Sequence, residues 1–67
     1  MSEPIETTAN ELATMADNIA QYRSRVSSVA ERHLGSERDD LVAAIYEAER
    51  QLRVAERALT RAVRTAR

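Results

Sequence analysis

The chain has 67 residues, which allow one domain at most, and below about 70–80 residues a single hydrophobic core rarely contributes more than about 3–5 kcal/mol. It has no cysteine, so disulfides and thiolate metal sites are excluded as other means of stabilisation. Its net charge is −1 and it has no apolar run of ~20 residues, so we expect a soluble, cytoplasmic protein rather than a membrane protein. Such a chain is expected to need a protein partner.

A first helix is predicted from about residue 4 to residue 34. Pro4 fits the first helical turn, and apolar side chains then recur at alternating spacings of three and four residues. This is the heptad pattern of a packed helix, in which the a and d positions face the neighbouring helix. The a positions are Ile5, Leu12, Ile19, Val26 and His33, and the d positions are Thr8, Met15, Tyr22 and Val29.

The helical pattern is broken once, in a turn predicted at residues 35–38. Gly35 is the only glycine and is expected to take the left-handed conformation that ends a helix. Ser36, followed three residues later by Asp39, is predicted to be the N-cap of a second helix. A connection this short forces the two helices to lie antiparallel.

The second helix is predicted from about residue 39 to residue 66, and it continues the same heptad rhythm. Its a positions are Ile45, Leu52, Leu59 and Ala66, and its d positions are Leu41, Ala48, Ala55 and Ala62. In an antiparallel pair, large residues of the first helix would face alanines of the second and allow close approach. The same register predicts an ion pair between Arg23 and Glu49, worth under ~1 kcal/mol if exposed.

Charge is distributed unevenly along the chain. Acidic residues and no basic ones precede Ile19, whereas arginines dominate from Arg50 onward. Each pole suits the dipole of its own helix, and an antiparallel hairpin brings the two poles side by side.

A second apolar stripe lies beside the predicted seam. It is broad enough to indicate a bundle helix rather than a solvated surface, and Tyr46 is predicted to be an anchor within it. Because good helix propensity explains alanine but not Val42, Tyr46 or Val63, we interpret the stripe as an interface. The predicted interface residues are Ala9, Ala13, Ala16, Ala20, Ala30, Leu34, Val42, Tyr46 and Val63.

A row of arginines follows the second helix, and it suggests a different function. Arg50, Arg53, Arg57, Arg61, Arg64 and Arg67 could follow a phosphate backbone. No stacking aromatic residue lies in the row and the acidic pole is near, so a solvated face is the favoured interpretation and nucleic acid is not the expected partner.

Catalysis, metal binding and cofactor binding are not expected. The serines have no local base, the carboxylates are not paired in a pocket, and neither Glu31 nor Asp39 lies three or four residues from His33, the spacing that shares a helix face. His33 is instead expected to be a helix-end residue beside the turn.

In arm length and glycine turn, the layout is similar to that of small secreted helical hairpins with a Trp-x-Gly turn. The turn here is His33-Leu34-Gly35, and the residue four positions after Tyr46 is Arg50, where an export signal of that family would have an acidic residue. The resemblance implies a hairpin fold, and it leaves export without a signal peptide open.

The sequence therefore predicts one all-α domain, residues 1–67, folded as an antiparallel two-helix hairpin. We expect a non-enzymatic interaction module that dimerises into a four-helix bundle. Two alternatives are a small adaptor or antitoxin-like subunit that folds onto a different helical protein, and a nucleic-acid-binding protein that uses the arginine row.

Overall fold

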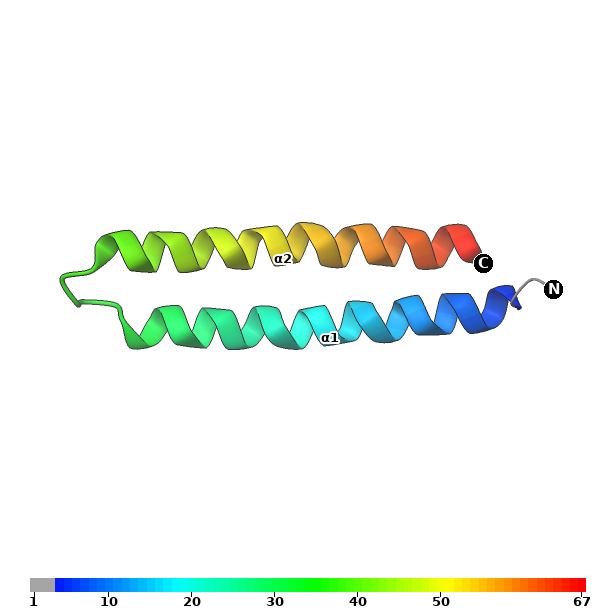
Figure 1. Cartoon of the computed structure of the whole chain (residues 1–67), viewed down its shortest axis with the longest axis horizontal. Coiled ribbons are helices and arrows are strands. Elements are labelled where there is room, and N and C mark those ends of the chain that lie inside the picture. Colours follow the sequence, from blue (N-terminus) through cyan, green and yellow to red (C-terminus); the bar gives the residue numbers. More distant parts are fainter. Residues whose placement is uncertain (1–3) are drawn as a thin grey trace.

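The computed structural model describes residues 4–67, which form two α-helices, α1 (Ile5–Arg32) and α2 (Asp39–Ala66). The helices lie side by side and run in opposite directions, joined at one end by the turn (Figure 1). The rod they form measures 56 × 17 × 14 Å. The all-α hairpin predicted from the heptads and the glycine turn is confirmed.

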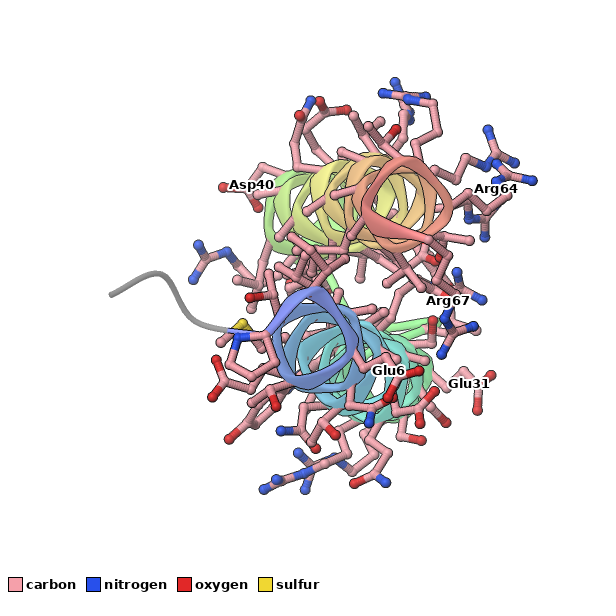
Figure 2. All side chains as sticks on the ribbon, turned by 90° about the vertical axis from the view of Figure 1, so that its right-hand side faces the viewer. Glu6, Glu31, Asp40, Arg64 and Arg67 are labelled. Carbon is pink, nitrogen blue, oxygen red and sulfur yellow. The ribbon has the colours of Figure 1, made fainter. Side chains whose placement is uncertain are left out.

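The two charged poles meet at the open end of the rod. Figure 2 shows Glu6 of α1 on the same side of the hairpin as Arg64 of α2 and Arg67, which follows α2. This is the arrangement predicted from the uneven charge distribution, with Glu6 in the first turn of α1 and Arg64 in the last turn of α2, each at the favourable end of its helix dipole.

The turn begins earlier than predicted, because α1 ends at Arg32 and not near residue 34. The N–H of His33 donates to the Ala30 carbonyl (3.0 Å), and the N–H of Leu34 donates to the Glu31 carbonyl (3.3 Å). These short-range bonds tighten the last helical turn. Gly35 then has φ +81°, so the prediction of a left-handed glycine is confirmed.

The predicted N-cap of α2 is wrong. Arg38 precedes the first helical residue, no side chain caps the helix, and the Ser36 hydroxyl instead accepts the Arg38 backbone N–H (3.3 Å) inside the turn. Arg38 also donates from its guanidinium to both oxygens of Asp40 (3.0 and 3.3 Å).

This turn also determines the acidity of Asp40. The Arg38 guanidinium, with the backbone N–H of Leu41, holds the pKa of the Asp40 carboxyl below its ordinary value of 3.8. Asp40 also lies in the first turn of α2, where negative charge suits the helix dipole.

The helices contact each other through a different stripe from the one predicted. On α1 the most buried residues are Ala9, Ala16 and Ala30, and on α2 they are Glu49 and Val63. These are the e positions of the two heptads. Alanine at heptad spacing removes the side-chain bulk that would hold two helices apart, so the backbones can approach along this stripe.

The a positions flank this contact and are only partly covered. Among the described residues, no large side chain is fully buried. Six aliphatic residues of the a positions are half-buried: Leu12, Ile19, Val26, Ile45, Leu52 and Leu59. Two helices cannot surround such side chains, so the hairpin has no closed core.

Candidate interaction face

Five of the nine predicted interface residues lie between the two helices of the hairpin itself. Ala9, Ala16, Ala30 and Val63 are buried and Val42 is half-buried. Since α2 is the only element that packs on α1 in the described chain, the helices cover these residues mutually. These five residues therefore lie inside the hairpin and not on the outer surface where the sequence analysis expected them.

The remaining four predicted residues do not form a continuous apolar face. Ala13 and Ala20 are half-buried along one edge of the contact, Tyr46 is just exposed, and Leu34 is exposed in the turn. The nine predicted interface residues are therefore split: five lie in the contact between the helices, and the other four lie outside it.

An ion cluster occupies the middle of the helix contact. Arg23 stands in the alanine stripe, donates a hydrogen bond to Glu56 (2.6 Å) and forms an ion pair with Glu49 (3.3 Å) across the contact. Arg53 reaches the same Glu49 oxygen from within α2 (2.9 Å). The predicted Arg23–Glu49 pair is confirmed, and Glu56 and Arg53 are additions to it. The Glu49 side chain is only 10% exposed, so the cluster is shielded from water on one side.

The stripe that directly precedes the contact residues of each helix is only partly covered: Met15, Tyr22 and Ala48 are exposed and its other members are half-buried. Met15 and Tyr22 directly precede Ala16 and Arg23, and their exposed fractions are 49% and 54%. One residue turns a helix by about 100°, and in an antiparallel pair the preceding residues of both helices lie on the same side. We name this the Met15/Tyr22 side. It consists of Thr8, Met15, Tyr22 and Val29 from α1 and Leu41, Ala48, Ala55 and Ala62 from α2.

The Met15/Tyr22 side is the more apolar of the two long sides of the hairpin. Thr8 is the only residue of this side without a mainly apolar side chain. At the edge of this side, the Arg25 guanidinium lies over the Tyr22 ring, 5.6 Å from the ring centre. The opposite side carries Arg53 and the open edge of the ion cluster. An apolar strip with charge confined to its rim is typical of a protein-binding surface.

The arginine row of α2 is exposed along its whole length, as predicted for an outer face. Arg50 pairs with Glu47 (3.0 Å) and Arg53 with Glu49 (2.9 Å). The next three arginines behave differently. Among residues 4–67, no carboxylate lies within ion-pair distance of Arg57, Arg61 or Arg64.

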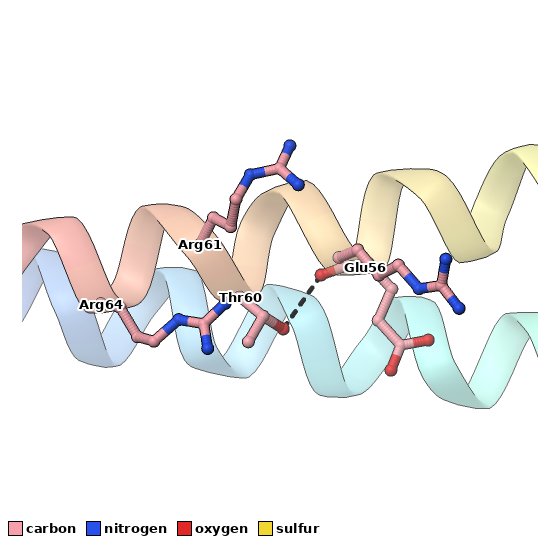
Figure 3. Close-up of a pocket in the computed structure, with 5 residues that line it drawn as sticks. Glu56, Thr60, Arg61 and Arg64 are labelled. Carbon is pink, nitrogen blue, oxygen red and sulfur yellow. Dashed lines mark hydrogen bonds between the residues drawn. The ribbon is translucent and has the colours of Figure 1, made fainter.

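Those three arginines line a shallow hollow of about 240 Å³ together with Glu56 and Thr60. Figure 3 shows Arg61 extending away from the hairpin, while the Thr60 hydroxyl donates to the Glu56 carbonyl of its own helix (3.0 Å). The carboxylate of Glu56 lies in the same hollow and already pairs with Arg23. It lowers the positive potential that an anion would meet.

Residues that could hold a metal do not gather in the part of the chain that the structure describes. His33 is half-buried at the end of α1, and among residues 4–67 no three acidic or histidine side chains converge as a metal site requires. Neither α1 nor α2 contains a stretch long and apolar enough to cross a membrane.

No protein-family model, curated protein or solved structure matches this chain. Its class is therefore defined by the structure alone, as a two-helix hairpin with an internal ion cluster and one partly covered apolar side.

The heptad pattern placed Met15 and Tyr22 at d positions and so predicted them to lie inside the hairpin. The predicted Arg23–Glu49 pair already indicated which stripe faces inward, because both residues occupy e positions. An ion pair across the middle of the contact requires the e positions, and so Ala9, Ala16 and Ala30, to face inward.

Proposed function

We propose that this protein is a non-enzymatic assembly module that self-associates through its Met15/Tyr22 side into a four-helix bundle. The observation that supports the proposal is the incomplete burial of its apolar residues. The leucines and isoleucines at the a positions are half-buried, and in the heptad they adjoin the d positions, where Met15 and Tyr22 are about half exposed. A second pair of helices on that side would close the core.

The exposed area agrees with this proposal. The chain exposes 5208 Å² and has a mass of 7.5 kDa. A compact monomer of that mass exposes about 4,200 Å², so the hairpin has about 1,000 Å² in excess. A stable interface buries about 800 Å² on each partner. The excess is therefore of the size that one interface would remove.

Burial of the two exposed anchors would add substantially to a marginal fold. Complete burial of a large apolar side chain contributes about 1.5–3 kcal/mol, and a tyrosine can keep its hydroxyl at a wet rim while its ring is buried. The hairpin alone is limited to about 3–5 kcal/mol. Association and folding would thus be coupled, and helicity would fall on dilution.

The first alternative is a small adaptor or antitoxin-like subunit, in which a different helical protein covers the same Met15/Tyr22 side. It shares the apolar chemistry and differs only in the identity of the partner. Self-association is favoured because the side carries both large and small residues, so a second copy offers a complementary surface without any further requirement.

The second alternative, a nucleic-acid-binding protein, is supported by the hollow that Arg57, Arg61 and Arg64 line. Its ligand would be a phosphate backbone bound without base recognition, since no aromatic side chain lines the hollow. Substitution of Arg57 and Arg61 by glutamate should abolish such binding and leave self-association unchanged.

The proposal is tested by analytical ultracentrifugation over a concentration series, with circular dichroism on the same samples. The wild-type chain should be a dimer, and Met15→Glu/Tyr22→Glu should weaken self-association by more than about 100-fold because two charges would have to be buried. Gln21→Glu/Ser28→Glu is the matched control, since it adds the same charge at the same spacing on exposed positions of α1.

The control variant should remain a dimer. A wild-type chain that stays monomeric at every concentration would overturn self-association. If that monomer is also poorly helical, the Met15/Tyr22 side belongs to a different protein. A Met15→Glu/Tyr22→Glu variant that still dimerises would show that the interface lies elsewhere.

A further inference from the structure

Large and small residues are segregated between the two helices on the Met15/Tyr22 side. The large exposed side chains, Met15 and Tyr22, both belong to α1. Along α2 the side continues from the half-buried Leu41 near the turn into Ala48, Ala55 and Ala62 at the same seven-residue spacing. This asymmetry bears on how a second copy would be oriented, an inference that rests on the proposed self-association.

Two hairpins can stack on this side about a twofold axis in two ways. If the axis runs along the helices, α1 of each copy packs on α2 of the other, and both turns lie at the same end. If the axis runs across the helices, α1 packs on α1 and α2 on α2, and the turns lie at opposite ends. Both arrangements are closed and use one patch twice.

Side-chain size distinguishes the two arrangements. With the axis along the helices, the large residues of each α1 meet the alanines of the other copy's α2, so both halves of the interface interdigitate. With the axis across them, the Met15 and Tyr22 side chains of the two α1 helices would meet one another and hold these helices apart. The alanines of α2 would then face alanines across a gap, with a loss of contact that tight packing does not tolerate.

The heights of these residues along the rod also match. Arg23 bonds to both Glu49 and Glu56, so it is level with a point midway between them. By the same register, Tyr22 lies within about half a helical turn of the level of Ala55. An axis along the helices preserves these levels, and it brings Tyr22 of one copy to Ala55 of the other.

Charge favours the other arrangement only slightly. An axis across the helices could bring Glu11 near Arg25 of the second copy, and both are exposed. Such a surface pair contributes at most about 1 kcal/mol, which is less than the burial of one large apolar side chain. Packing therefore decides between the two arrangements.

We propose that two copies associate about a twofold axis along the helices, with α1 of each packed on α2 of the other and both turns at the same end. The second copy supplies small residues for Met15 and Tyr22, and it receives the same two side chains on its own alanines. The face is self-complementary because α1 carries the large side chains and α2 carries the small residues that receive them.

The chain has no cysteine, so single labelling sites can test this arrangement directly. Glu37→Cys places a label in the exposed turn, and Thr65→Cys places one near the opposite end. Energy transfer is measured between donor- and acceptor-labelled chains. The molar mass in solution is measured by light scattering on the same labelled samples. Circular dichroism verifies that each labelled variant keeps wild-type helicity.

The expected result is a dimer with efficient transfer between two Glu37→Cys chains and between two Thr65→Cys chains, and little transfer between Glu37→Cys and Thr65→Cys. Each 28-residue helix is about 42 Å long, so labels at opposite ends are well separated. A dimer with the reverse pattern would overturn the arrangement and leave self-association intact. A monomer would overturn both.

Discussion

Removal of the Arg23 guanidinium is the most direct test of the ion cluster between the helices. Among residues 4–67, Arg23 is the only basic residue that pairs with Glu49 and Glu56 across the contact, and Arg23→Ala removes it. Glu49 keeps Arg53, whereas Glu56 has no other ion-pair partner among residues 4–67. The variant therefore leaves a partly buried carboxylate without its counter-charge.

The burial of the cluster determines the expected magnitude. A fully buried pair that loses one partner costs about 3–5 kcal/mol, and an exposed pair costs at most about 1 kcal/mol. Arg23 is 32% exposed and Glu49 is 10% exposed, so the cluster lies between these limits. We expect a loss of about 1.5–3 kcal/mol, the usual range for hydrogen bonds to charged groups. That loss is about half of what a core of this size provides.

Urea unfolding followed by circular dichroism measures this difference at one fixed protein concentration, because the stability of a self-associating chain depends on concentration. Arg53→Ala is the matched control, since it removes an arginine from the same Glu49 but leaves Arg23 in place. It should cost less than about 1 kcal/mol. Arg23→Lys should be intermediate, because an ammonium group is a point charge without the planar fork of arginine.

Equal losses for Arg23→Ala and Arg53→Ala would refute this reasoning. They would mean that the cross-helix bonds contribute no more than a surface pair, and that the cluster does not hold the register of the hairpin.

Two further predictions concern the alanine contact and the turn. Ala30→Leu should lower the free energy of unfolding by about 1–3 kcal/mol, since Ala30 is fully buried and the added bulk must separate the helices. Ala58→Leu, on an exposed position, should change it by less than about 0.5 kcal/mol in the same urea titration, and comparable losses would contradict the observed contact face. Arg38 depresses the pKa of Asp40 below 3.8, so the stability that ionised Asp40 contributes is complete above that pH and is lost as the pH falls through the lower folded-state value. The wild type should thus exceed Asp40→Asn in thermal midpoint near neutral pH and lose that advantage in acid, and an advantage that grows in acid would show the opposite linkage.

Local chemistry made most of the fold predictable. Gly35 is the single break in two long heptad patterns, and its left-handed conformation is required wherever the chain reverses this sharply. The prediction failed at Ser36, whose hydroxyl bonds to the next turn residues and not to the first turn of α2. Serine bonds equally well to several nearby backbone groups, so spacing alone does not select one of them.

The candidate site was harder to predict, because α1 carries three neighbouring stripes that are largely apolar, at its a, d and e positions. Hydrophobicity alone favours burial of Met15 and Tyr22, which are large, over Ala9 and Ala16, which are small. The structure places the alanines inside, because contact between two backbones depends on the space left between them as well as on the area buried.

By itself, the sequence determined that there are two helices, that they run antiparallel, and that Arg23 meets Glu49, because turn chemistry, heptad spacing and charge are all local or depend only on the register. Only the tertiary structure decided which stripe of each helix lies inside. A heptad repeats identically for the a, d and e positions, and the choice among them is made by the fit of one helix against the other. That choice buried Ala9, Ala16 and Ala30 and left Met15 and Tyr22 on the surface.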